Sequence, residues 1–420
     1  MVPLMSNTTQ EDRTVMQRVI FIMMLFYLIQ PYGCNPGLFG LPLTIYLKES
    51  LKLSPAQLAT FTSLIFIPWL IRPLYGIIGD VIPIFGYQFK SYFCICYTLA
   101  IVVLLGLSTL QFNIISLIAA GVILVNVAIA FSDVLTDKIM VVQGRILNNT
   151  ARLQAAQWTS LGFGKALLYY IGGWLAQNSN LSIAFLLTAI VPLFGLVATF
   201  VLLADEKKQQ KTVSLKSSLK SLWLAMKSRQ LLAVIGFIAC LEFTLIPSFV
   251  NYLVYYQKDS LNFDAQFIGI LGTFEAVANG FGAIVFGIFA FRIARRRLLN
   301  VAIGFTAVST LGLIFIQNMQ SAILVSLFFG FFAMIAMLGV LEIAARACPV
   351  GAEGSTYAVM MSVYNLVKQP GPILGGYLYD RGVPVSTLVI ISALFTACCW
   401  FLIPLLRLAR EPSLSDGHQF

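Results

Sequence analysis

Residues 164–175 read GKALLYYIGGWL, and residues 367–378 read VKQPGPILGGYL. In both stretches a lysine is followed at the same interval by Gly-Gly, an aromatic residue and leucine, so Lys165 and Lys368 correspond at an offset of 203 residues. A second set of polar positions corresponds at a similar offset, Asp133 and Asp137 with Glu342 and Arg346. Offsets of this size in a chain of 420 residues indicate two halves built as a parallel repeat.

The composition identifies the solvent around these halves as lipid. Hydrophobic residues make up 59% of the chain and charged residues only 10%, whereas soluble domains have about 25% charged residues. Apolar runs long enough to cross a bilayer recur with polar breaks between them. We therefore predict an all-α integral membrane protein with 12 transmembrane helices, at residues 17–46, 55–79, 91–110, 113–139, 152–177, 181–203, 230–257, 263–291, 298–317, 321–347, 354–379 and 384–407.

Each half of the repeat then holds six helices, in residues 1–204 and in residues 230–420. Two such pseudo-repeats are the organisation of the major facilitator fold. Residues 205–229 form the predicted inside linker between the halves. Apolar residues at helical spacing in this linker favour either a short amphipathic helix on the membrane surface or an ordinary linker: Leu215, Leu219, Leu222, Trp223 and Met226.

Basic residues predict the orientation. With both termini inside, the inside loops hold twenty lysines and arginines, and the outside loops hold only Lys48, Lys52, Lys258 and Arg381. Because cytoplasmic loops of membrane proteins carry the excess of basic residues, both termini are expected to be cytoplasmic. The net charge of +10 is therefore interpreted as topology and contact with anionic membrane lipids, and no nucleic-acid partner is expected.

Several function classes are disfavoured by the residues the chain lacks. Its one histidine, His418, lies in the C-terminal tail, which argues against a histidine metal centre, a Ser-His-Asp site and a histidine proton relay. Seven cysteines without a CxxC pair argue against a zinc site, and no cofactor is expected. A membrane enzyme or a receptor is less favoured than a carrier. A channel is harder to exclude, although a repeat with buried charges at equivalent positions favours a carrier.

Charged residues predicted at mid-membrane are the main candidates for function, because each costs about 2.5 to 3.5 kcal/mol to insert. Lys165 and Lys368 are expected to face each other across a central cavity and to attract anions. Glu242 and Glu275, on spans seven and eight, could neutralise them in the empty protein, or one of the two could titrate. Nearer the inside, Arg72 and Asp133 are expected to form a stabilising or gating pair. The candidates for proton coupling or gating are Asp133, Arg72, Glu275, Asp80 and Asp137.

Helix breaks are predicted at a similar depth. Residues 30–37 (QPYGCNPG) interrupt span one, and residues 369–372 (QPGP) interrupt span eleven. Proline frees backbone carbonyls, which are tolerated at depth only against protein or a wet cavity. Amides near these breaks and on span five could bind a ligand or hold helices together: Gln30, Asn35, Asn365, Gln369, Gln154 and Gln157. Trp158 could stack on a flat ring or lie in the interfacial aromatic belt.

Four stretches resemble the folate–biopterin transporter family. They are YLKESLKLSPAQ at 46–57, IPWLIRPLYG at 67–76, the loop from Gly79-Asp80 to Gly86-Tyr87, and SDVLTD at 132–137. The Pro-Trp-x-x-Arg-Pro-Leu-Tyr-Gly run is the most specific of them. The chain departs from the family pattern at Gly79, where members often have serine, and at Gln88-Phe89, where they are more basic.

The resemblance implies a secondary active transporter of folates or pterins that works by alternating access with proton coupling. The two lysines would bind the glutamate tail of folate. Glu242 or Glu275 would accept hydrogen bonds from the pterin edge, and Phe243 or Phe274 would stack on the ring. The chain looks like a compact bacterial member in the plasma (inner) membrane, acting as a monomer. A carrier of the same fold for another organic anion or a drug is the alternative.

Overall fold

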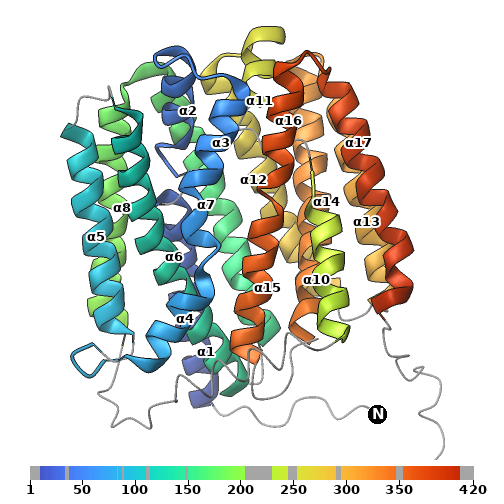
Figure 1. Ribbon diagram of the computed structural model, residues 1–420. Coiled ribbons are helices and arrows are strands. Elements are labelled where there is room, and N and C mark those ends of the chain that lie inside the picture. Colours follow the sequence, from blue (N-terminus) through green and yellow to red (C-terminus); the bar gives the residue numbers. More distant parts are fainter. Residues whose placement is uncertain are drawn as a thin grey trace, which may run out of the picture.

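The computed structural model describes residues 10–33, 37–82, 84–87, 89–109, 114–146, 150–203, 229–244, 253–289, 295–346 and 353–406. Over these ranges the chain is almost entirely helical, and its helices run side by side in one upright bundle (Figure 1). Helix α1 (Gln10–Gly33) begins at the lower end of the bundle in Figure 1. We call this end the terminal end and the opposite one the distal end.

Within its described residues, the first half contains nine helical segments before residue 203. They are α1, α2 (Gly40–Glu49), α3 (Pro55–Ile65), the 3-10 turn η1 (Ile67–Trp69), α4 (Arg72–Val81), α5 (Lys90–Thr109), α6 (Ile115–Ile146), α7 (Thr150–Asn178) and α8 (Leu181–Leu202). The predicted first span therefore consists of α1 and α2, and the second consists of α3, η1 and α4. The predicted break in span one falls between α1 and α2, at residues that include Asn35 and lie outside the described ranges.

The second half follows the same pattern after residue 229. Its segments are α10 (Arg229–Glu242), α11 (Leu253–Tyr255), the π-helical turn η2 (Tyr256–Ser260), α12 (Ala265–Phe289), α13 (Arg295–Gly312), η4 (Leu313–Phe315), α14 (Met319–Arg346), α15 (Glu353–Val367), α16 (Pro370–Asp380), α17 (Val385–Cys398) and η5 (Cys399–Leu406). The predicted break in span eleven lies at Lys368 and Gln369. Most of the linker, with its predicted amphipathic helix, lies outside the described residues.

Each predicted span overlaps one or more of these segments. Within the described part of the chain, six helical stretches are long and apolar enough to cross a membrane. Two helices extend beyond the apolar spans predicted for them: α1 begins at Gln10, before residue 17, and α6 continues to Ile146, past residue 139. Hydropathy ends a span where polar residues begin, but helical backbone hydrogen bonds continue through polar residues.

Local sequence explains where α3 begins. The Ser54 hydroxyl accepts a hydrogen bond from the backbone N–H of Gln57, and the Gln57 side chain accepts one from the backbone N–H of Ser54. This reciprocal capping satisfies two N–H groups that a helix start would leave unpaired. Pro55 follows at the first helical position, where its missing N–H costs nothing. The distal end of span two is fixed in this way.

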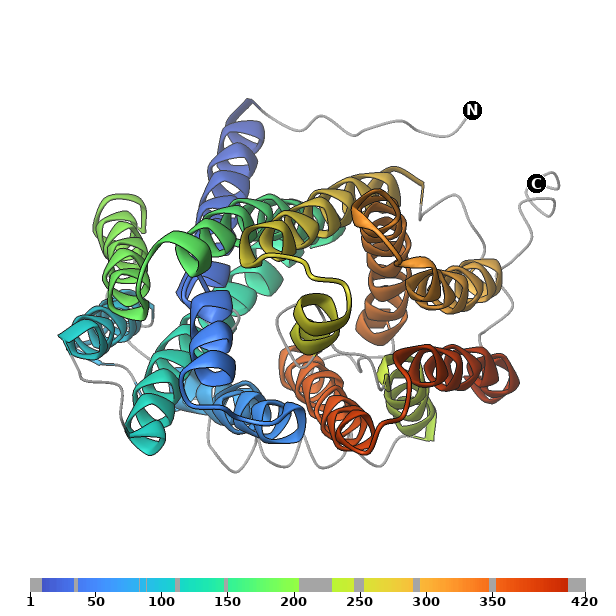
Figure 2. The ribbon, with the colours of Figure 1, turned by 90° about the horizontal axis from the view of Figure 1, so that it is seen from above.

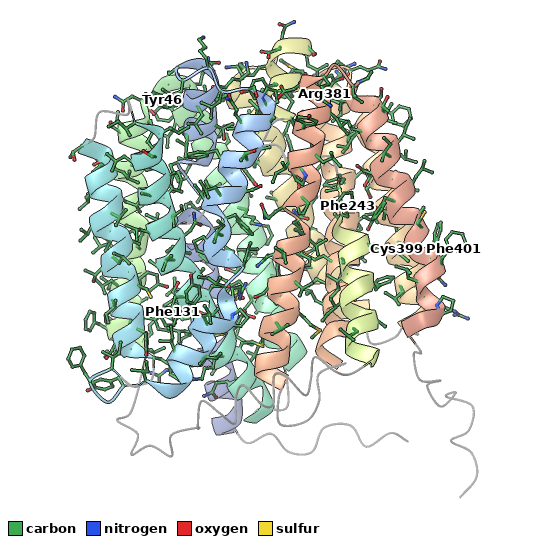
Figure 3. The ribbon with its side chains drawn as sticks, viewed as in Figure 1. Tyr46, Phe131, Phe243, Arg381, Cys399 and Phe401 are labelled. Atoms are coloured by element: carbon green, nitrogen blue, oxygen red, sulfur yellow. The ribbon has the colours of Figure 1, made fainter. Side chains whose placement is uncertain are left out.

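The two halves lie side by side when the bundle is seen from above, with α1–α8 on one side and α10–η5 on the other (Figure 2). One apolar cluster fills the first half and a second lies within the other half. A third cluster crosses between the halves and joins Leu41 and Ile45 of α2 to residues such as Val254 and Leu388. Large apolar side chains also face outward, as Phe401 does at 82% exposure (Figure 3). Outward apolar surface of this kind fits a lipid surrounding.

Helices α7 and α12 carry the closest contact between the halves. A Cβ atom placed on Gly162 would lie 2.9 Å from the Cα of Gly280, and one on Gly173 would lie 2.8 Å from the Cα of Gly269. These glycines therefore let the two backbones approach more closely than side chains would allow, as small residues do between membrane helices. The two contact points are eleven residues apart on each helix, so α7 and α12 pack together along much of their length.

Candidate functional site

The break in span two positions the first group of candidate residues. Proline has no N–H and clashes with the preceding turn, so Pro68 and Pro73 interrupt the helix. Helix α3 ends at Ile65, and α4 begins at Arg72 after the 3-10 turn η1. Arg72 therefore lies in the first turn of α4, from which its guanidinium group reaches α6.

Arg72 binds two carboxylates of α6 at once. Its Nη2 atom lies 2.6 Å from Asp133 Oδ2 and 2.7 Å from Asp137 Oδ2. Residues four apart lie on one face of a helix, so both aspartates can reach the same partner. The Asp133 side chain is only 2% exposed, and that of Asp137 is 17% exposed. The structure thus contains the expected Arg72–Asp133 pair and extends it by Asp137.

Helix α1 completes this group from the other side. The Tyr27 hydroxyl donates a hydrogen bond to Asp137 Oδ1, and Gln30 donates from Nε2 to Asp133 Oδ1 at 2.9 Å. We call Tyr27, Gln30, Arg72, Asp133 and Asp137 the carboxylate cluster. With all three charged groups ionised it carries one net negative charge. Burying an uncompensated charge costs several kcal/mol, so the cluster is suited to hold one proton.

The second group lies where the halves meet at α7 and α12. Lys165 of α7 and Glu275 of α12 are both half-buried, and the Lys165 ammonium group acts electrostatically on the Glu275 carboxyl group. The backbone carbonyl of Glu275 is in turn packed against Gly330 of α14, since a Cβ there would lie 2.3 Å from it. The electrostatic contact with Glu275 thus gives Lys165 an acidic neighbour from the other half.

Lys368 lies at the break of span eleven. The helix ends at Val367 and begins again at Pro370. The Lys368 ammonium group donates to the Tyr364 hydroxyl and lies 3.9 Å from the centre of the same ring. A tyrosine one turn earlier thus holds a half-buried lysine where the helix is interrupted.

The other predicted ligand residues lie in different surroundings. Gln157 is 1% exposed and donates to the sulfur of Met23 on α1 at 3.7 Å, and Trp158 packs against the apolar core of the second half. Phe243 lies 4.8 Å from the ring of Phe395 on α17, near mid-height in Figure 3. Phe274 is half-buried on α12, next to Glu275. The side chains of Gln154, Asp80 and Glu242 lie outside the described part.

The two amides of span eleven point to protein atoms. Asn365, which is 8% exposed, donates from Nδ2 to the Trp69 carbonyl of the other half at 3.3 Å. Gln369 donates to the Asn365 carbonyl at 3.4 Å. The interpretation of Asn365 as glue between helices therefore has a partner in the structure.

Contacts between the halves also lie at the distal end. Lys48 lies 2.7 Å from Asp259 Oδ1, and Lys258 forms an ion pair with Glu49. Both lysines are predicted in outside loops, but the sequence does not predict these pairs. Neighbouring residues of opposite charge at Lys48-Glu49 and Lys258-Asp259 are the signal that could have indicated reciprocal pairing.

Span two and span eleven also meet at the distal end. The Ser54 hydroxyl and the Ala56 N–H both donate to Asp380 Oδ2 at 3.0 Å. The carboxylate of α16 thus lies at the start of α3, where the helix dipole favours negative charge. Tyr255 donates to the Leu53 carbonyl nearby. Together with the two ion pairs, we call these contacts the distal closure.

Sequence reasoning missed Tyr27 and Tyr364 as parts of these groups. Tyr27 lies three residues before Gln30, and Tyr364 lies four residues before Lys368, so both share a helix face with a predicted residue. Helical spacing could have indicated them. Within the described residues no cluster of three or more metal-ligating side chains occurs.

Comparisons with known proteins agree with this architecture. Residues 32–409 match the family model described as the BT1 family. The Folate-biopterin transporter of Synechocystis sp. is 27% identical over 408 residues, covering 90% of this chain and 80% of that protein. Folate transporter 1 of Plasmodium falciparum is 24% identical over 373 residues, covering 86% and 73%.

Solved structures show the same fold at low identity. The nucleoside transporter NupG superposes with a TM-score of 0.68 at 13% identity, covering 93% of this chain and 98% of that one. A D-xylose-proton symporter superposes with a TM-score of 0.70 at 13% identity, covering 93% and 99%. The predicted all-α membrane fold of major facilitator type is confirmed.

Proposed function

Because the chain belongs to the BT1 family, it is a membrane transporter, and we propose that it carries folates or pterins by alternating access as a proton-coupled secondary active transporter. The observation that carries this proposal is that one lysine in each half lies beside a polar partner: Lys165 acts electrostatically on Glu275, and Lys368 donates a hydrogen bond to Tyr364. Two related proteins named as folate transporters support the substrate class.

The lysines provide the anion site of the proposal. Folate ends in a glutamate tail with two carboxylates, and an ammonium group from each half can bind one of them. In this proposal Glu275, on which the Lys165 ammonium group acts electrostatically, is the acidic partner of Lys165. When a substrate carboxylate replaces Glu275 as the partner of Lys165, the Glu275 carboxylate must either take up a proton or accept hydrogen bonds from another part of the substrate.

The aromatic end of the substrate is assigned to the same helix. The pterin ring has adjacent N–H donors, and one carboxylate can accept hydrogen bonds from both of them. Glu275 or Glu242 would provide that carboxylate. Phe274, beside Glu275 on α12, is better placed to stack on the ring than Phe243, whose ring packs on Phe395 of α17. This assignment keeps the site between the two halves, where alternating access requires it.

The carboxylate cluster provides the coupling site. It takes one proton to lose its net charge, and Asp137 is the more exposed of its two carboxylates, at 17% against 2% for Asp133. We therefore assign proton entry to Asp137. A membrane potential of 100 mV supplies about 2.3 kcal/mol for each charge moved, which is enough to drive accumulation.

The distal closure and the basic residues support a conformational state and an orientation for the proposed carrier. With the distal end held shut, the substrate would exchange at the terminal end. The excess of basic residues in the loops at that end supports cytoplasmic termini in a bacterial plasma membrane. The distal closure would then be the gate to the outside.

Uptake by purified protein in proteoliposomes tests the function. Radiolabelled folate should accumulate when the outside pH is lowered, and a protonophore should abolish the accumulation. Unlabelled pterin and methotrexate should compete. Competition by neither, together with uptake of an unrelated organic anion, would contradict the substrate class. Indifference to the pH gradient and to the protonophore would contradict proton coupling.

A further inference from the structure

The backbone carbonyl of Trp69 occupies an unusual position in the break of span two. In an uninterrupted helix it would accept a hydrogen bond from the N–H four residues later, but that residue is Pro73, which has none. Asn365 of α15 donates to this carbonyl at 3.3 Å. Trp69 is 5% exposed and Asn365 is 8% exposed, so water competes little for the bond.

Trp69 lies beside the carboxylate cluster and contacts it through Arg72. Its indole Nε1 donates at 2.9 Å to Asn126 of α6, which is fully buried and itself donates to the Val122 carbonyl. The guanidinium carbon of Arg72 lies 5.7 Å from the centre of the Trp69 ring. Trp69 therefore contacts both α6 and Arg72, and a shift of Trp69 is expected to change the position of Arg72 between Asp133 and Asp137.

On the side of the second half, Asn365 lies close to Lys368. It lies three residues before Lys368, on the same side of the helix, and its carbonyl accepts a hydrogen bond from Gln369. The donor Asn365 and the ring of Tyr364, on which the Lys368 ammonium group rests, are adjacent in the chain. A substrate carboxylate that draws Lys368 would therefore move Asn365.

We propose that the Asn365–Trp69 hydrogen bond couples the substrate site at Lys368 to the carboxylate cluster, with Asn365 as a positioning residue that acts through Arg72. This inference rests on the proposed function. Coupling between two sites is reciprocal, so protonation of the cluster must change substrate affinity by the same factor by which the substrate changes proton affinity. Besides Asp133 and Asp137, the titratable or charged members of the cluster are Tyr27 and Arg72, and Tyr97 of α5 faces it from outside among the described residues.

The experiment measures the substrate KM in counterflow, with no gradient, across the pH range over which wild-type uptake changes. Coupling free energies are commonly equivalent to about 5- to 150-fold in affinity, so the wild-type KM should change at least about fivefold. Asn365→Ala should make the KM nearly independent of pH, while counterflow persists and gradient-driven accumulation is lost. Asn365→Leu, which has a similar volume, no donor and no titratable group, should behave like Asn365→Ala.

Ser362→Ala is the matched control. Ser362 lies on the same helix, one turn from Asn365, and its buried hydroxyl has no hydrogen-bond partner among the described residues. It should keep the wild-type pH dependence. A pH-dependent KM in Asn365→Ala and Asn365→Leu would overturn the inference and leave the proposed function intact. A pH-independent KM in the wild type would instead contradict proton coupling itself, and the inference with it.

Discussion

Lys48 and Asp259 form an ion pair of 2.7 Å between the two halves, although 211 residues separate them in the chain. Lys48→Asp should weaken the distal closure by placing two negative charges together, and Lys48→Asp with Asp259→Lys should restore it. Asp259 is 56% exposed, so the pair is worth about 0.2 to 1 kcal/mol, or a few-fold in the population of the open state.

Labelling of a buried cysteine measures that change. Ala59 is 0% exposed and packs against Gly376 of α16, so Ala59→Cys in a background without the native cysteines is shielded while this end is closed. A maleimide should label it faster in the Lys48→Asp background and at the original rate in the charge-swapped one. Equal labelling in all three backgrounds would show that the ion pair does not hold the closure.

The α7–α12 contact predicts a sharp difference between two glycine substitutions. In Gly269→Ala the new Cβ would lie 2.5 Å from the Tyr169 carbonyl, so the helices must separate, and such overpacking costs about 1 to 3 kcal/mol. Gly106→Ala on α5 meets nothing within 4 Å and should be neutral or stabilising by up to about 1 kcal/mol. Thermal unfolding in detergent measures both, and similar midpoints for the two variants would contradict the close contact.

Removal of Arg72 should destabilise the protein strongly. Arg72→Met leaves Asp133 and Asp137 buried without their cation, and breaking a buried ion pair from one side costs about 3 to 5 kcal/mol. Arg72→Met with Asp133→Asn and Asp137→Asn has no charge left to compensate and should recover most of the unfolding temperature. It should still exchange substrate but fail to accumulate it against a gradient. Recovery of accumulation would remove the cluster from the coupling mechanism.

Both lysines should be needed for uptake. Lys165→Ala and Lys368→Ala should each abolish folate uptake and leave the protein folded, as judged by gel filtration. Because Lys165→Ala removes the neighbour of Glu275, Lys165→Ala with Glu275→Gln is the matched variant that leaves no unopposed charge. It should fold like the wild type and still fail to bind. Normal uptake in either single variant would refute the two-lysine site.

Much of the fold could be predicted from the sequence because lipid imposes a simple rule on it. Apolar runs of bilayer length must be helices, and the Lys-Gly-Gly repeat relates the halves. The Arg72–Asp133 pair could be expected for the same reason, since opposite charges at depth need partners. Boundaries such as Ile146 could not, because a helix can continue beyond the apolar residues that reveal it.

The parts that sequence reasoning missed depend on how helices rotate and break. The amide of Asn365 was considered for a ligand or for helix contacts, but only the geometry around Pro73 shows that a carbonyl of Trp69 needs a donor. Gln157 faces Met23 because of the rotation of α7 against α1, which the short pattern around it does not specify. The distal pairs join α2 to η2, whose separation is set by the packing of whole helices.

The distal closure and the α7–α12 contact differ in the forces that hold them. The closure depends on partly exposed charges, which salt screens over about 8 Å at physiological ionic strength, whereas the glycine contact is made by backbone atoms that salt does not affect. Added electrolyte on the distal side should therefore loosen that face of the carrier and leave the contact between α7 and α12 unchanged. The ionic composition of one compartment alone thus acts on how often the carrier opens toward it.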